Sequence, residues 1–283
     1  MAEEIKAIDV MNYYFVGIKD QMMKSREASQ MFGAMFGREL PGIYKGLKPE
    51  EFIAAMDEGG FEKTFICAFK MWSFYDNRLI WDSPIDDTYK LVQKYPDRFV
   101  GQASYNPFRI KESLEEIDKA VKDYGFKGVY CHTLGFNVAP NDRRMYPCYA
   151  KCVELGIPFA FQAGHSLELM PSEPGRPIYV DQVALDFPDL TIVGSHTGWP
   201  WCEEMIAVAW KFPNVYIDVA AHMPRYLDKS LVNFMNTRGR RKVLFGTNGI
   251  GFKEVKDDFL KLGLREETNK AVLRENAIRV YKL

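Results

Sequence analysis

Eight short apolar runs, separated by segments of helical periodicity, constrain the fold of this chain more than any other feature. The runs lie at residues 5–11, 63–69, 99–105, 128–132, 158–163, 191–196, 215–220 and 242–248. Strands that alternate with helices pair in parallel through crossover helices. Eight such units in 283 residues predict a (β/α)8, or TIM, barrel. An open doubly wound sheet is the alternative, but no phosphate-binding glycine motif follows the first run.

The segments between the runs support one barrel domain over residues 1–283. Residues 48–60, 109–125 and 146–156 have helical periodicity, and the last two end in a glycine that suits a helix C-cap. Residues 14–47 are too long for an ordinary strand-to-helix connection and carry apolar Met and Phe side chains. We expect this insertion to pack against the barrel or a second subunit, or to form a lid.

Composition excludes several classes of partner. The chain is 47% hydrophobic and 27% charged, with a formal net charge of -1 and no basic run, so neither nucleic acid nor an anionic membrane surface is an expected partner. No apolar run approaches the about 20 residues that span a bilayer. The acidic start of the chain has no secretory signal, and the 5 cysteines then indicate reduced thiols and a cytoplasmic location.

All 4 histidines of the chain follow predicted strands. His132 and His196 end the fourth and sixth runs, His165 follows the fifth, and His222 follows the seventh. In a parallel barrel the functional groups gather at the carboxyl ends of the strands. A single histidine there is usually a hydrogen-bonded structural residue, but four on one face predict a functional site.

The most informative local string is FPDLTIVGSHTGWPW, residues 187–201. An apolar strand ends at His196, Gly198 allows a tight turn, and Pro200 suits the start of the next helix. This turn would direct the imidazole into the barrel mouth, beside the indole of Trp199 or Trp201. An imidazole suits general acid–base catalysis because its ordinary pKa is about 6.5.

The strings IVGSHTGWPW, GIPFAFQAG, PNVYID, KVLFGTN and ENAIRVYKL resemble the amidohydrolase-related family of TIM-barrel hydrolases and decarboxylases, which includes aminocarboxymuconate-semialdehyde decarboxylase. Members of that family typically bind one divalent metal. The resemblance places the four usual ligand positions, which are three histidines and an aspartate, on Met11, Tyr13, Gln162 and Asn248. Only His196 matches its motif, as the residue that acts on the substrate or the metal.

A thioether, a phenol and two neutral amides are poor ligands for a dication. We therefore expect no metal cofactor. The alternative is one zinc or manganese ion at a relocated site, with ligands drawn from His132, His165, His196, His222 and Asp218.

The resemblance and the residues together predict a metal-independent hydrolase or non-oxidative decarboxylase. Its expected substrate is a small cyclic or aromatic carboxylic acid or carbonyl compound. The candidate catalytic residues are His196 as the acid–base group, Asp218, Tyr13 and His165. The candidate substrate-binding residues are Met11, Gln162, Asn248, Trp72, Tyr105, Tyr130, His132, Trp199, His222 and Arg225.

A second class of function stays open, in which the changed ligands mark a non-catalytic protein that binds a small molecule. In either case the expected partner is a small molecule. A homodimer is common in the family and fits the apolar insertion.

Overall fold

A computed structural model describes residues 5–14, 24–27, 29 and 46–283 of the chain. Within these residues, eight parallel strands form one sheet in the order β1-β2-β5-β6-β7-β8-β9-β10. Their bounds are β1 Ala7–Asp9, β2 Phe61–Cys67, β5 Phe99–Ser104, β6 Val129–Cys131, β7 Phe159–Gln162, β8 Ile192–Ser195, β9 Val215–Asp218 and β10 Val243–Leu244.

Backbone hydrogen bonds join the first and last strands of this sheet. The N–H of Val10 donates to the carbonyl of Phe245 at 3.0 Å, and the N–H of Asn248 donates to the carbonyl of Met11 at 2.9 Å. The sheet therefore curls round until its two edges meet, and the predicted TIM barrel is confirmed. Nearly all strand residues are buried, as expected for parallel strands covered by helices.

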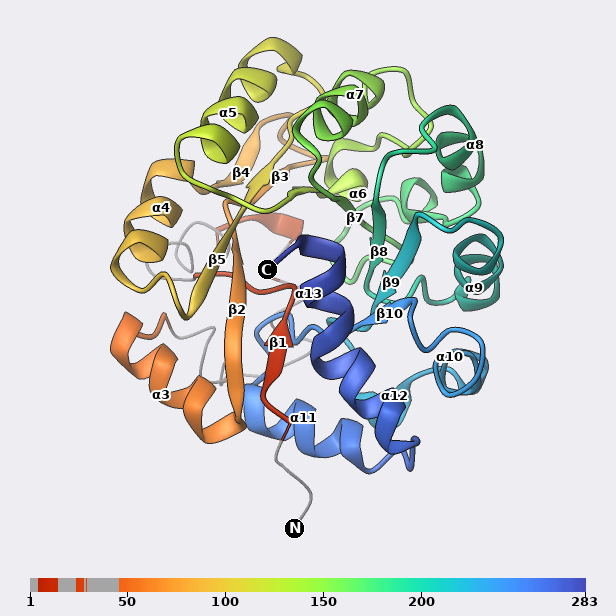
Figure 1. Cartoon of the computed structure of the whole chain (residues 1–283). Coiled ribbons are helices and arrows are strands. Elements are labelled where there is room, and N and C mark those ends of the chain that lie inside the picture. The colour runs from red at the N-terminus through yellow and green to blue at the C-terminus, as the bar shows by residue number, and fades with distance from the viewer. Residues whose placement is uncertain (1–4, 15–23, 28, 30–45) are drawn as a thin grey trace.

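Helices surround the strands (Figure 1). The outer helices are α3 Pro49–Gly59, α4 Ile85–Lys94, α5 Ile110–Lys122, α7 Tyr146–Leu155, α8 Tyr179–Asp186, α9 Cys202–Lys211, α10 Lys229–Met235 and α11 Phe252–Leu260. Shorter elements are α6 Thr133–Phe136, η2 Glu173–Gly175, η3 Pro224–Tyr226, α12 Glu266–Lys270 and the π-helical turn η4 Ala271–Glu275. The expected C-cap is confirmed at Gly156, whose φ of 65° is left-handed.

The final helix, α13 Asn276–Tyr281, lies across the centre of the barrel in Figure 1. The ring of Tyr281 is buried against Phe65 of β2, with 4.5 Å between centroids. Lys282 binds the carbonyl of Gly156, just before β7. These contacts lie toward the amino ends of the strands. Helix α13 therefore covers that end of the barrel, and the carboxyl ends of the strands form the mouth.

Two features differ from the sequence-based expectations. A β-hairpin that was not predicted, β3 Lys70–Trp72 paired with β4 Leu79–Asp82, follows β2 outside the barrel sheet. Every barrel strand ends one to four residues before its predicted run does; β6 and β8, for example, end at Cys131 and Ser195, because the next residues turn away. His196 and Thr197 take left-handed φ angles of 70° and 65°, which cannot continue a strand.

The predicted insertion at residues 14–47 lies mostly outside the described residues, and its roles in packing or as a lid stay predictions. No helix in the described part of the chain has the length and apolar character needed to cross a membrane.

Candidate active site

Besides Tyr130, whose ring forms part of the wall, six of the predicted site residues lie buried at the mouth, just beyond or at the ends of their strands. They are Met11, Tyr13, His132, Gln162, His196 and Asp218. Asn248, after β10, is partly exposed. The barrel thus brings together residues from β1, β6, β7, β8, β9 and β10 that are distant in sequence, as expected for a site at the carboxyl ends of parallel strands.

The junction of β1 and β10 is held by the buried carboxylate of Asp9. One oxygen accepts the N–H groups of Met11 at 3.1 Å and Thr247 at 2.9 Å; the other accepts the Asn12 amide at 2.8 Å and the Thr247 hydroxyl at 2.5 Å. Burial raises the pKa of Asp9 to about 6, although the bonds from Thr247 and Asn12 lower it. This network places Met11 and Tyr13 at the mouth and closes the barrel.

A second buried carboxylate, Asp218 at the end of β9, holds the turn that carries His196. It accepts the Ser195 hydroxyl, the N–H of Ala220 at 2.9 Å and the N–H of His196 at 3.3 Å. Burial raises its pKa to about 6, against the lowering effect of the Ser195 bond. Asp218 therefore positions the backbone of His196 rather than its ring; its predicted role as a base stays a prediction.

The imidazole of His196 is buried and uncharged at neutral pH. Burial, followed by the neighbouring His222 and His132, lowers its pKa to about 3. The backbone of Ala220 acts in the opposite direction on this pKa, and the Nδ1 atom of His196 is buried without a hydrogen-bond partner in the described part of the chain. Burial also lowers the pKa of the partly exposed His222, with the backbone of His196 acting in the opposite direction.

His132 lies across the mouth on the turn after β6. Its Nδ1 accepts the N–H of Gly135 at 3.1 Å, which caps the short helix α6. Its Nε2 is buried, and no described residue hydrogen-bonds it. Burial lowers the pKa of His132, with the carboxylate of Glu168 acting in the opposite direction. His132 is thus a second neutral imidazole with one unused nitrogen.

Aromatic rings line the space beside these imidazoles. Phe69 lies 4.9 Å from Tyr13, 5.8 Å from Tyr130 and 5.5 Å from His132 between ring centroids. The hydroxyl of Tyr130 donates to Oε1 of Gln162 at 3.4 Å. Burial raises the pKa of Tyr130 well above its ordinary value, so the phenol stays protonated. These side chains give the mouth flat walls and neutral hydrogen-bonding groups.

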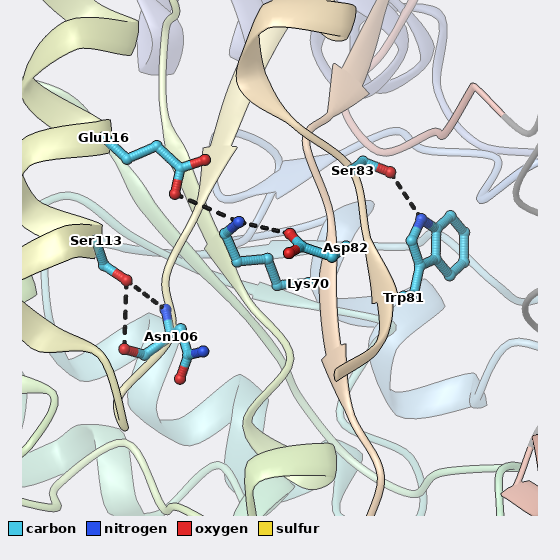
Figure 2. A network of polar contacts seen from close by, with 7 residues as sticks. All are labelled: Lys70, Trp81, Asp82, Ser83, Asn106, Ser113 and Glu116. Carbon is cyan, nitrogen blue, oxygen red and sulfur yellow. Dashed lines mark hydrogen bonds and ion pairs between the residues drawn. The ribbon is translucent and has the colours of Figure 1, made fainter. Parts of the chain in front are cut away.

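The β3–β4 hairpin packs against this wall, and ion pairs of Lys70 hold the hairpin in place. Lys70 lies between two carboxylates, with Nζ 2.7 Å from Asp82 and 3.3 Å from Glu116 of α5 (Figure 2). On the neighbouring strand, the indole of Trp81 donates to the hydroxyl of Ser83 at 2.8 Å (Figure 2). The Trp81 ring packs 5.1 Å from Tyr13. The hairpin thereby holds Trp81 against Tyr13.

The loop after β7 forms the outer rim. His165 is exposed; its Nδ1 lies 3.0 Å from the Ser172 hydroxyl, and its ring packs 5.5 Å from Trp199. Trp199 is itself 48% exposed. A groove of about 460 Å³ runs between residues 165–171 and the hairpin tip at Phe74 and Tyr75. The predicted catalytic role of His165 and substrate contact of Trp199 stay predictions for this outer rim.

Three predicted substrate-binding residues have other partners. Trp72 packs 4.9 Å from Phe108, and the hydroxyl of the fully buried Tyr105 donates to the carbonyl of Arg144 at 2.7 Å. Arg225 is exposed and lies 3.2 Å from the carboxylate of Asp258. These contacts hold the three side chains against neighbouring residues around the mouth. A direct substrate contact by any of the three stays a prediction.

The residue-based reasoning did not select two residues that the structure places at the mouth. Asp9 was not among the predicted site residues, although its charge in an otherwise apolar run is the available signal. Glu168 lies in the groove of the outer rim, where its carboxylate accepts the Ser166 hydroxyl, and it acts electrostatically on both His132 and Tyr130. It lies in a long loop without periodicity, and no sequence pattern marks it.

The donors at the mouth do not form a metal cluster. In residues 5–14, 24–27, 29 and 46–283, no three His, Cys, Asp or Glu side chains converge closely enough to hold a metal ion.

Solved structures share this barrel along its whole length. An uncharacterized TIM-barrel protein from Bordetella bronchiseptica superposes with a TM-score of 0.80 and 24% identity, covering 97% of this chain and 98% of that one. A 5-carboxyvanillate decarboxylase from Novosphingobium aromaticivorans, complexed with manganese and 4-hydroxy-3-methoxy-5-nitrobenzoic acid, gives 0.72 and 17%, covering 100% of both chains.

A dihydroxybenzoic acid decarboxylase from Polaromonas sp. JS666, with bound manganese and the inhibitor 2-nitroresorcinol, gives a TM-score of 0.74 and 16% identity, with 99% and 98% coverage. A search of curated proteins finds no match. The sequence profile described as Amidohydrolase, however, matches residues 18–283. Since that match includes the strands and turns that build the mouth from β2 to β10, the chain belongs to the amidohydrolase-2 family of TIM-barrel enzymes.

Proposed function

We propose that this protein is a metal-independent decarboxylase or hydrolase that acts on a small aromatic or cyclic carboxylic acid or carbonyl compound, with His196 as its acid–base residue. The observation that carries the proposal is the buried Nδ1 of His196, which has no hydrogen-bond partner in the described chain and belongs to a ring that is neutral at pH 7. A buried polar atom without a partner is rare in native structures and marks a place for a ligand.

The donor set argues against a divalent ion at the position where the family resemblance would place one. The side chains there are the thioether of Met11, the phenol of Tyr13 and the amides of Gln162 and Asn248. Zinc prefers thiolate, imidazole and carboxylate ligands, and manganese prefers carboxylates. None of these four side chains carries a negative charge at neutral pH, so they cannot balance a dication.

The same groups suit a planar organic acid. Phe69, Tyr13 and Tyr130 provide flat apolar surfaces, and the amides of Gln162 and Asn248 can hydrogen-bond a carbonyl or carboxylate. A bound carboxylate near His196 would favour its protonated form and raise the pKa that burial has lowered. The substrate itself would then make the imidazole a stronger base.

Both reaction types start with a proton leaving an O–H group for Nδ1 of His196. In hydrolysis, the water that loses this proton attacks the carbonyl carbon. In decarboxylation, the bond between the ring carbon and the carboxylate breaks and carbon dioxide leaves. The electron pair stays on the ring carbon, which takes the proton from His196. The solved decarboxylases that share the fold favour decarboxylation.

Two measurements test the proposal. Protein purified without chelator is analysed for metals. Decarboxylation is followed as carbon dioxide release from a panel of hydroxy- and methoxybenzoic acids, and hydrolysis is followed on a separate panel of aromatic lactones and esters. We expect less than about 0.1 equivalent of zinc or manganese and activity that survives dialysis against chelator. One equivalent of metal that is lost together with activity would overturn metal independence and favour a relocated site.

A non-catalytic binding protein is the second candidate, favoured by the four changed ligand positions. It predicts binding of the same acids without turnover of any. The homodimer, the single domain over residues 1–283 and the cytoplasmic location remain predictions.

A further inference from the structure

A cavity lined by three arginines lies at the end of the barrel opposite the mouth. Its volume is about 520 Å³, within the range of pockets that bind small molecules. The loop before β10, α12, η4 and α13 enclose it, and α13 lies beside β10 (Figure 1). Asn276 donates to the carbonyl of Val243, the first residue of β10, at 2.7 Å, which places the cavity at the amino end of that strand. The polar and charged lining residues are Arg240, Arg241, Glu267, Glu275, Asn276 and Arg279.

The buried side chain of Asn276 holds this lining in a fixed arrangement. Its Nδ2 atom also donates to the carbonyl of Arg240 at 2.8 Å, and its Oδ1 atom accepts from Nη2 of Arg279 at 3.0 Å. Arg279 donates in addition to the carbonyl of Arg241 at 2.5 Å and to the hydroxyl of Tyr216 at 3.2 Å. The Arg279 guanidinium is therefore held in position beside the backbone of Arg241 before any ligand binds.

Most of the guanidinium donors around the cavity are unused. An arginine side chain has five N–H donors. Arg240 donates from Nη1 to Glu267 at 2.5 Å, and Arg279 makes three hydrogen bonds. The guanidinium of Arg241 is exposed and has no hydrogen bond or ion pair with any described residue. A ligand with several acceptor oxygens can use these remaining donors.

Positive charges outnumber negative charges around the cavity. Nζ of Lys242 lies 4.9 Å from the centre of the Tyr216 ring, and the Arg279 guanidinium lies 5.5 Å from the same centre. Burial, followed by the charge of Arg279, lowers the pKa of Lys242 to about 8, so this side chain is still charged at pH 7. The three arginines and Lys242 are balanced only by Glu267 and Glu275, which leaves an excess of two positive charges. Such an excess destabilises the fold by repulsion, and a bound dianion would remove it.

A π-helical turn, η4, forms one side of the cavity. Single π-helical turns are rare and often occur at functional sites. Glu275, at the end of η4, lines the cavity, and no described residue pairs with its carboxylate. A free carboxylate can accept hydrogen bonds from hydroxyl groups of a ligand. The described lining includes no aromatic ring on which a nucleobase could stack.

We propose that this cavity binds a small phosphate monoester that carries hydroxyl groups, as a sugar phosphate does. A phosphate monoester has a charge near -2 at pH 7, which matches the excess positive charge. Its oxygens accept hydrogen bonds from the guanidinium groups of Arg241 and Arg279, whose planar shape suits phosphate. Its hydroxyl groups donate to Glu275. The site lies at the other end of the barrel from His196 and is independent of the proposed reaction.

Calorimetric titration at low ionic strength with three probes tests the ligand class. The probes are glucose 6-phosphate, inorganic phosphate and glucose. We expect glucose 6-phosphate to bind more tightly than inorganic phosphate, and glucose not to bind, because only the first probe has both the phosphate and the hydroxyl groups. Absence of binding by either phosphate at about 10 mM would overturn the site. Equal affinity for the two phosphates would overturn the contact between Glu275 and the hydroxyl groups.

Arg241→Gln tests whether the cavity itself binds the phosphate. The substitution removes an exposed guanidinium but keeps the backbone carbonyl that Arg279 uses. Arg238→Gln is the matched control, because Arg238 lies in the same loop but packs 4.5 Å from the Trp210 ring and is not among the described lining residues. We expect about a tenfold loss of glucose 6-phosphate affinity in Arg241→Gln and less than about a twofold loss in Arg238→Gln. Equal losses would mean general attraction to a basic surface and would overturn the site.

Glu275→Ala separates the two parts of the ligand. Removing this carboxylate should strengthen binding of inorganic phosphate, because a like charge is lost, but weaken binding of glucose 6-phosphate relative to inorganic phosphate. An unchanged ratio of the two affinities would overturn the role of Glu275. Melting curves without ligand confirm that each variant is folded.

Discussion

The mouth of the barrel has two ends that are equally buried but differ in how their polar groups are used. At the β1–β10 junction, four donors surround the carboxylate of Asp9, and the Asn12 amide is bonded through both its nitrogen and its oxygen. Across the mouth, His132 and His196 each retain a buried nitrogen without a partner in the described chain.

We infer a structural role for one end of the mouth and a functional role for the other, although both ends are equally buried. An unsatisfied buried polar group costs about 1–3 kcal/mol, and proteins rarely keep one without a reason. The closed end around Asp9 is complete and needs nothing else, so we assign it to stability. The open end around His132 and His196 keeps two buried nitrogens without partners in the described chain, and we propose that it serves binding and chemistry.

The largest effect should come from changing the open end at His196. Asn tolerates the left-handed φ of 70° at this position, but it cannot take up a proton. We expect His196→Asn to lower kcat/KM about 100- to 10,000-fold on the substrate found by the panel. The melting temperature should change little, because the buried ring nitrogen contributes no bond. Activity within threefold of wild type would contradict the assignment.

Changing the closed end should have the opposite pattern. Asp9→Ala leaves four buried donors without their acceptor, including the N–H groups of Met11 and Thr247. We expect a loss of about 3–5 kcal/mol in the free energy of unfolding, measured by urea denaturation at pH 7. Thr247→Val, which removes one hydroxyl from the same network, should lose less. A stable Asp9→Ala protein would show that the junction is held by packing alone.

The two ends should also respond to pH with opposite signs. The pKa of Asp9 is raised to about 6 from 3.8, so the stability gained from the proton on Asp9 is complete below pH 3.8 and is lost as pH rises through about 6, while the hydrogen bonds that its carboxylate accepts remain. The pKa of His196 is lowered to about 3 from 6.5, so stability falls as pH drops below 6.5, where only the unfolded state binds a proton.

Each group contributes a slope of roughly 1.4 kcal/mol per pH unit within its window. Between pH 4 and 6 we therefore expect Asp9→Asn to lose stability less steeply than wild type as pH rises, and His196→Asn to lose it more steeply. Denaturation curves at pH 4.5, 5.5 and 6.5 measure the three slopes. Parallel slopes in all three proteins would contradict the burial of these groups.

The barrel was predictable because its signal is repeated along the chain. An approximate position for each apolar run was enough to show that strands and helices alternate, and this alternation predicts a parallel barrel. In such a barrel the histidines that follow the strands lie on one face. The β3–β4 hairpin was missed because Lys70, Ser73 and Asp82 interrupt any apolar period. Its stability comes instead from contacts with α5 and the mouth, which are distant in sequence.

The positions of the candidate residues were predictable, but their contacts were not. His196, His132, Gln162 and Tyr13 lie at the mouth as the strand ends indicated. The sequence could not show that Asp218 binds the backbone of His196, or that Gly135 fixes the tautomer of His132. Such roles depend on ångström-scale distances between atoms of different loops, which residue types and spacings do not determine.

The smallest effect tests whether the unpredicted hairpin supports the mouth. Lys70→Met keeps the length of the side chain but removes the charge from between Asp82 and Glu116 (Figure 2). The Lys70 side chain is only 10% exposed, so we expect a loss of about 1–2 kcal/mol in stability and faster amide exchange in β3 and β4.

Lys90→Met is the matched control for this change. Lys90 lies 2.7 Å from Asp87, the same distance as Lys70 from Asp82, but its side chain is 74% exposed. An exposed pair of this kind contributes at most about 0.5 kcal/mol. Because Trp81 on the hairpin packs against Tyr13, Lys70→Met should also weaken binding of the hydroxy- and methoxybenzoic acids a few fold. Lys90→Met should leave this binding unchanged. Equal effects of the two substitutions would mean that the hairpin is held by its aromatic contacts and that Lys70 contributes only as an ordinary surface charge.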